Sequence, residues 1–272
     1  MPVTPAHPAA VLPLLRGPLV PAALVAGAVA PDVPYSLRAT GIPVSAQSWY
    51  EPFLNATTSH SAAGLLPVAL PLALALFALW LLARRPLAAL LPALAPRPDR
   101  TRRAWWAGAA RVLVSALVGI ATHLVWDGLT HGDGWLVQRF PASGEPAFAG
   151  LTRARVWEHG NSVAGLLVLA VFAHRRRARL LAGLDGPARR RAGTALVLAA
   201  GAALTGAVLA ARRWWGETGV SGLHLLEGVA SDAVKGAGAA LGLAAVVAVA
   251  AWWVHRAATG HRLAPARSRG GR

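Results

Sequence analysis

In GIATHLVWDGLTHGDG, residues 119–134, an apolar segment ends in a row of ionisable side chains. His123, Asp127 and His131 stand four residues apart, and such steps on an α-helix keep side chains within about 80° of one face. Two imidazoles and a carboxylate suit Zn²⁺ or another divalent transition metal. The alternative is that Asp127 ends the helix and each histidine is an interfacial side chain with its tip in water.

The chain around this stretch is too apolar for an ordinary soluble domain. It has 272 residues, of which 55% are hydrophobic and 14% charged, with a mean hydropathy of +0.47. A net charge of +16 would suggest a nucleic-acid partner in a soluble protein. Here the arginines gather between apolar runs, as in cytoplasmic loops of membrane proteins, so we expect no nucleic-acid partner. Cysteine is absent, which leaves nitrogen and oxygen as metal ligands.

The apolar runs predict an all-α, polytopic membrane bundle. A span needs about 20 mostly apolar residues. Five segments qualify, at residues 62–83, 105–126, 160–174, 193–211 and 236–254. They predict one membrane-embedded domain over residues 1–255, with its motifs in residues 1–165, followed by a basic, disordered tail over residues 256–272.

The N-terminal 30 residues predict a re-entrant or interfacial helical hairpin. One half runs from about Pro8 to Leu15 and the other from about Val20 to Val29, with a turn at Arg-Gly-Pro. Each half is too short to cross the membrane, so the pair is expected to enter the bilayer and return to the same side. Its irregular backbone then has to be covered by other parts of the protein. The hairpin brings His7 and Asp32 to one side. Residues 35–59 are predicted to form an extramembrane loop.

The arginines also predict the orientation of the chain. The most basic segments are the loops 84–104 and 174–192 and the tail after residue 255, which places them in the cytoplasm. The composition, rich in Ala, Arg, Gly and Pro, suggests a bacterial source, and hence a multi-pass protein of the bacterial cell membrane. Seven metal-competent side chains then fall at one depth on the extracytoplasmic side: His7, Asp32, His60, His123, Asp127, His131 and His159. Ionisable groups near a membrane are costly unless paired or functional, and a metal would satisfy several at once.

The order of these groups resembles the ligand order of the zinc-dependent phospholipase C and P1 nuclease group. More closely, TPAHPAA, APDVPY, SHSAAG and HLVWDGLTHGDG are similar to the signatures of bacterial membrane-bound metal-dependent hydrolases, and of an uncharacterised bacterial membrane family with the same motifs. The resemblance implies one metal site from Asp32, His60, His123 and Asp127. It implies a second from His131 and His159, and a third from His7 with Asp127 as a bridge.

Two positions depart from the soluble enzymes. Val163 stands where those enzymes carry a glutamate four residues after the last histidine, and Met1 stands where they carry a tryptophan ligand. The sequence therefore predicts one or two metals, with Glu158 as a substitute ligand.

The predicted function is hydrolysis of phospholipid or another phosphoester at the membrane surface, with zinc as the expected ion and Asp32 or Asp127 as the base. Membrane lipid and a phosphoester are the expected partners, and the oligomeric state stays open. Arg38, Arg139, Arg153 and Arg155 are candidates to hold an anionic head group. A second polar set near the last span, from His224 to Lys235, includes Glu227 and an expected local ion pair between Asp232 and Lys235.

Two rival functions use the same residues. One is a divalent-metal carrier or sensor that binds without turnover, and the other is a non-catalytic membrane protein with a degenerate metal site. A carrier would require polar side chains that continue through the bilayer. The segments 62–83 and 193–211 contain almost none. The sequence therefore favours a site at one membrane surface.

Overall fold

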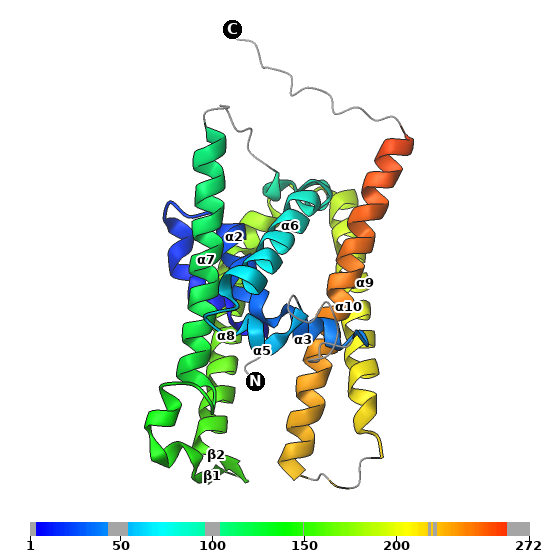
Figure 1. Cartoon of the computed structure of the whole chain (residues 1–272). Helices are drawn as coiled ribbons and strands as arrows, with labels where there is room; N and C mark the ends of the chain where they lie inside the picture. The colour runs from blue at the N-terminus through cyan, green and yellow to red at the C-terminus, as the bar shows by residue number, and fades with distance from the viewer. Residues whose placement is uncertain are drawn as a thin grey trace.

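The chain forms a bundle of long helices in which the short N-terminal hairpin packs against the first three spanning helices, while the last two spanning helices pair with each other (Figure 1). The computed structural model describes residues 4–42, 54–95, 104–148, 150–216, 219 and 222–259. Within these residues, five helical segments are long and apolar enough to cross a membrane. The predicted all-α, multi-pass architecture is thereby confirmed.

The five spanning segments are longer than the apolar runs that predicted them. They are contained in α6 (Leu70–Leu90, preceded by a π-turn, η4, at Leu65–Ala69), α7 (Ala104–Thr130), α8 (Arg153–Leu181), α9 (Gly186–Ala211) and α10 (Gly222–Ala258). The fifth segment, predicted at residues 236–254, shows the largest difference, followed by the third, predicted at residues 160–174. The helix of the third segment continues because backbone hydrogen bonding does not stop where the apolar residues stop, and arginines form the exposed last turns of α8.

The predicted N-terminal hairpin is present. Its first half is α1 (Pro8–Val11) continued by a 3₁₀ segment, η2 (Leu12–Arg16), and its second half is α2 (Pro21–Val29). A second 3₁₀ turn, η1, precedes it at Thr4–Ala6. Pro13 has no backbone N–H to donate, which explains why the first half does not continue as an α-helix. Val11, Leu24 and Ala28 form a buried cluster, so protein covers the hairpin as its irregular backbone requires.

Two glycines set the distance between the hairpin and α7. A Cβ atom on Gly119 would lie 2.2 Å from the carbonyl oxygen of Leu24, and one on Gly27 would lie 2.2 Å from that of Ala116. The backbones of α2 and α7 therefore touch, as small residues allow between membrane helices. Val20 N–H also donates to the buried Ser115 Oγ of α7 at 2.8 Å. These contacts fix the end of α2, and thus Asp32, against α7.

Short elements connect the long helices. After the hairpin come η3 (Ala30–Asp32), α3 (Val33–Arg38) and α5 (Ala56–Ser59), so part of the predicted loop at 35–59 is helical, while residues 43–53 lie outside the described residues. The remaining short elements are η5 (Pro92–Leu94), η6 (Val137–Arg139), η7 (Pro141–Gly144), an antiparallel pair of strands β1 (Pro146–Phe148) and β2 (Leu151–Thr152), and η8 (Arg212–Trp214). Of the predicted tail, residues 256–258 belong to α10 and residues 260–272 lie outside the described residues.

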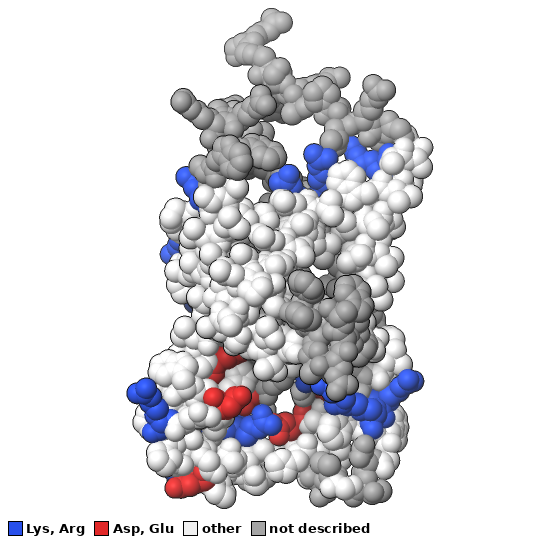
Figure 2. All heavy atoms as spheres, viewed as in Figure 1, with Lys and Arg blue, Asp and Glu red and all other residues white. Residues whose placement is uncertain are grey.

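Charge is distributed as expected for a membrane protein. Figure 2 shows Lys and Arg spheres at both ends of the visible face and an almost uncharged band between them, with the visible acidic residues at the end where β1 and β2 lie. The outer faces of the long helices expose large apolar side chains, among them Leu196, Val197 and Leu198 of α9. Such faces are suited to contact with lipid.

Candidate metal centre

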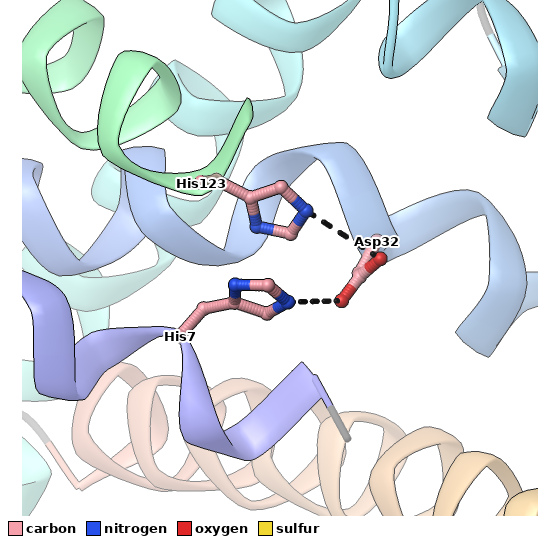
Figure 3. A group of neighbouring side chains, drawn as sticks. All are labelled: His7, Asp32 and His123. Carbon is pink, nitrogen blue, oxygen red and sulfur yellow. Dashed lines mark ion pairs between the residues drawn. The ribbon is translucent and has the colours of Figure 1, made fainter. Parts of the chain in front are cut away.

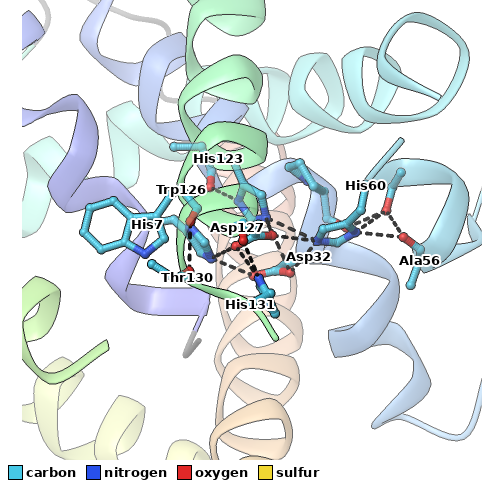
Figure 4. A network of polar contacts seen from close by, with 12 residues as sticks. His7, Asp32, Ala56, His60, His123, Trp126, Asp127, Thr130 and His131 are labelled. Atoms are coloured by element: carbon cyan, nitrogen blue, oxygen red, sulfur yellow. Dashed lines mark hydrogen bonds and ion pairs between the residues drawn. The ribbon is translucent and has the colours of Figure 1, made fainter. Parts of the chain in front are cut away.

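Four separate segments bring ionisable side chains to one buried point. His123 and Asp127 lie one turn apart on α7, Asp32 ends η3, His60 follows α5, and His7 precedes α1. Figure 3 shows that the rings of His7 and His123 lie beside each other and point toward the Asp32 carboxylate. Figure 4 shows His60, Asp127 and His131 in the same network.

The two carboxylates lie between the imidazoles. Asp127 Oδ2 is 3.1 Å from His123 Nε2 and 3.5 Å from His60 Nε2, and its Oδ1 is 3.5 Å from His7 Nε2. Asp32 Oδ1 is 3.1 Å from His60 Nε2 and 3.7 Å from His123 Nε2, and its Oδ2 is 3.7 Å from His7 Nε2. Two donor sets have all their ligand atoms within 4.8 Å of one another: His7, Asp32 and His123, and His60, His123 and Asp127.

Backbone carbonyl groups fix the tautomers of two histidines. His123 Nδ1 lies 2.8 Å from the carbonyl oxygen of Ala28, and His60 Nδ1 lies 2.7 Å from that of Ala56. A carbonyl oxygen only accepts, so each Nδ1 carries a proton, and in the neutral form each ring presents its lone pair at Nε2. The two Nε2 atoms are 3.2 Å apart. In that form the two facing lone pairs suit a shared cation, and the hydrogen bond at the other nitrogen of each ring is typical of metal-ligating histidines.

The burial of these groups supports the same interpretation. His7 and His123 are 1% and 0% exposed, and Asp32 and Asp127 are also buried. Among the described residues, His7 Nδ1, Asp32 Oδ2 and both carboxylate oxygens of Asp127 are buried without a hydrogen-bond partner. Burying a polar atom without a hydrogen-bond partner lowers the stability of the folded protein. A divalent ion would satisfy the carboxylate oxygens and the Nε2 lone pairs together, so the residues present fit a metal.

Electrostatics keep two of the groups in the forms that bind metals. Burial, together with the neighbouring His123, lowers the pKa of His7 to about 4, so its imidazole is neutral at neutral pH. Burial alone would raise the pKa of Asp32, but the neighbouring imidazoles of His60, His123 and His7 outweigh it and hold that pKa below its usual value. A neutral imidazole and an ionised carboxylate are the forms required for coordination.

The structure brings together six of the seven predicted histidine and aspartate ligands, and the predicted substitute ligand Glu158 pairs with Arg155 instead. His131 is at the edge of the cluster, with Nδ1 3.3 Å from Asp127 Oδ1. His159 lies elsewhere, since its Nε2 is 3.2 Å from Glu227 Oε1 of α10. Of the second polar set, Lys235 Nζ lies 3.9 Å from Asp232 Oδ1, as expected for a local pair, and Trp214 Nε1 donates to Asp232 Oδ2 at 2.6 Å.

Three residues near the cluster were not assigned a role from the sequence. Ser59 Oγ donates to the carbonyl oxygen of Pro31 at 2.7 Å and so ties α5 to η3 beside Asp32. The Tyr35 ring lies 5.6 Å from that of His60, and burial and the nearby Asp32 raise the pKa of Tyr35 to about 12. The edge of Trp126 meets the His7 ring at a centroid distance of 6.2 Å. The only sequence signal for these contacts was proximity to a ligand along the chain.

The cluster is open to a cavity on one side. A cavity of about 840 Å³ is lined by His60, Asp127 and His131, by Tyr35, and by residues of α8 and α10 that include Arg155 and His224. His7, Asp32 and His123 do not line it and lie behind its wall. The cluster therefore has an inner set of buried donors and an outer set that a small molecule can reach.

The fold and this cluster define a class: multi-pass membrane proteins with a buried His/Asp group able to hold a metal ion. The chain belongs to the family described as a domain of unknown function, DUF4184, whose model matches residues 1–261. No curated protein and no solved structure matches the chain.

The positions of His60 and His159 lead to opposite predictions. We expect His60→Ala to lower the metal content of the purified protein strongly, because it removes an Nε2 donor that faces Asp32, Asp127 and His123. We expect His159→Ala to retain the metal, because His159 pairs with Glu227 instead. Elemental analysis of both variants against wild type measures this, and equal loss of metal from both would contradict the geometry.

Proposed function

We propose that this protein is a membrane-embedded, metal-dependent hydrolase that acts on phosphoesters, with phospholipid head groups as its substrates at the membrane surface. The observation that carries the proposal is the 3.2 Å approach of the His60 and His123 Nε2 atoms beside Asp127, at the wall of a cavity large enough for a small organic group. The similarity of the motifs to those of membrane-bound metal-dependent hydrolases adds support.

The inner and outer donors suggest different roles. His7, Asp32 and His123 are buried behind the cavity wall and would hold the ion together with His60 and Asp127 at that wall. Zinc is the expected ion, given nitrogen and oxygen ligands. When bound, such an ion lowers the pKa of a coordinated water and stabilises charge that develops on a substrate oxygen. Asp127 lines the cavity and Asp32 does not, so Asp127 is the better placed of the two carboxylates to accept a proton from a water in the cavity.

We place the site on the extracytoplasmic side. The supporting observation is that the arginine-rich ends of α6, α8 and α10 lie at the end of the bundle away from β1 and β2, while the cavity includes residues of β2 and the first turns of α8 (Figure 1). Arginine-rich ends are typical of the cytoplasmic face.

The experiment that tests the function is hydrolysis by purified protein with and without metal. We expect turnover of bis(4-nitrophenyl) phosphate and of phospholipid in mixed micelles, complete loss of both after treatment with a chelator, and recovery on addition of zinc. A protein that binds stoichiometric metal, cleaves neither substrate and carries the ion into vesicles would instead be a carrier. A protein that binds no metal would contradict both functions.

A further inference from the structure

A second group of charged side chains joins α8 to α10 at the edge of the cavity. Arg155 Nη1 lies 3.3 Å from Glu158 Oε2 on its own helix, and Arg155 Nη2 lies 3.1 Å from Glu227 Oε1 on α10. His159 Nε2 is 3.2 Å from the same Glu227 oxygen. The residues of the metal cluster lie in the first half of the chain, whereas Glu227 lies on α10, the last spanning helix. Through its contact with Arg155, α10 reaches the edge of the cavity.

Arg155 differs from the other arginines near this end of the bundle. Among the described residues it is the one Lys or Arg that lines the cavity holding His60 and Asp127. Arg153, two residues earlier on α8, pairs with Glu145 at 3.0 Å and lines a separate groove beside β1. Arg38 and Arg139, the other candidates from the sequence, do not line the cavity.

The two carboxylates hold the Arg155 guanidinium in one place. Glu158 is 1% exposed and Glu227 is largely buried, while the Arg155 side chain stays 43% exposed. A guanidinium has five N–H donors in a planar fork, so contacts to two carboxylates leave donors for a third anion. Planar, charge-assisted recognition of phosphate oxygens is the chemistry for which arginine is suited.

An anionic substrate also needs a cation on this wall. The cavity is lined by the carboxylates of Asp127, Asp133 and Glu158, which repel a phosphate group. We infer that Arg155 binds the phosphate group of an organophosphate substrate in this cavity, and that Glu227 of α10 is a positioning residue for Arg155. The inference rests on the proposed function, because the metal cluster would act on the same phosphate.

The test compares Arg155→Ala, Arg155→Lys and Glu227→Gln with Arg153→Ala, a matched control two residues away and outside the cavity. For each zinc-loaded protein, the zinc content, kcat and KM are measured with soluble bis(4-nitrophenyl) phosphate and with phospholipid in nanodiscs. Binding of inorganic phosphate is measured separately by calorimetry, which does not depend on turnover.

We expect Arg155→Ala to raise KM and to weaken phosphate binding by about 10- to 100-fold, the effect of losing a hydrogen bond to a charged group, with unchanged zinc content and similar kcat. Arg155→Lys should recover part of the loss. Glu227→Gln should raise KM by about 3- to 10-fold, and adding it to Arg155→Ala should have no further effect, because both act through one guanidinium. A larger kcat/KM for phospholipid than for the soluble ester would identify lipid as the source of the phosphate.

Two results would overturn the inference. One is phosphate binding by Arg155→Ala within about twofold of wild type, and the other is an equal loss in Arg153→Ala. Failure of the proposed function looks different: wild type would cleave neither ester, while the calorimetry would still show whether phosphate binding depends on Arg155.

Discussion

Replacing Asp127 by alanine is expected to release the metal and to lower phosphoester hydrolysis by about a thousandfold, because several kcal/mol of charge stabilisation is lost with the ion. Asp127 contacts four imidazoles, those of His7, His60, His123 and His131. Its loss removes the carboxylate that faces both donor sets. Elemental analysis and a hydrolysis assay on the same preparation measure the two effects together.

The matched control for this variant is Asp133→Asn. Asp133 is an exposed carboxylate six residues further along the chain, beyond the end of α7 at Thr130, and has no ion pair among the described residues. We expect this variant to keep its metal. If Asp127→Ala retained stoichiometric zinc and full activity, the cluster would not be the metal site.

Replacing Gly119 by alanine is expected to separate the N-terminal hairpin from α7. The new Cβ would meet the Leu24 carbonyl oxygen at 2.2 Å and the Ala28 nitrogen at 2.9 Å, and both are backbone atoms that cannot rotate away. Overpacking of this kind costs about 1–3 kcal/mol or more, which corresponds to a fall in Tm of roughly 5 °C for a chain of this size. The metal content should fall as well, because Ala28 fixes the His123 ring and α2 leads to Asp32.

Gly108→Ala on the same helix is the control for Gly119→Ala. A Cβ atom at Gly108 meets nothing within 4 Å among the described residues. Alanine is the better helix former, so this change should leave Tm unchanged or raise it slightly. Thermal unfolding in detergent, followed with zinc analysis, separates the two variants. If both variants had the same Tm and the same zinc content, the α2–α7 contact would not determine the metal site.

Local features of the sequence predicted most of the fold. The second half of the hairpin was expected at about residues 20–29 and is α2 at Pro21–Val29, because proline favours the first turn of a helix. The helix ends were less accurate. Composition marks the part of a helix that suits lipid, whereas α8 continues from Arg153 to Leu181 through residues that lie outside such an environment.

The candidate site was predicted in part. The row on α7 followed from helical spacing, which is local. The approach of His60 to Asp32 depends on the Ser59 contact with Pro31, which no spacing rule reveals. His159 shows the limit most clearly: its neighbour Glu158 is 1% exposed, while the His159 side chain is 37% exposed and turned to Glu227. Consecutive residues on a helix point about 100° apart, and the sequence does not specify how α8 is rotated.

The order in which the donors occur along the chain also bears on how the protein matures. His7, Asp32 and His60 all precede the first spanning helix, and their partners His123 and Asp127 end the second. During synthesis, His7, Asp32 and His60 are therefore made before His123 and Asp127. The cluster can assemble only after α7 has entered the bilayer and packed against α2. If the cluster binds an ion as proposed, uptake of that ion would follow the insertion of α7, and a ribosome-bound chain that stops before α7 should be unable to retain the metal.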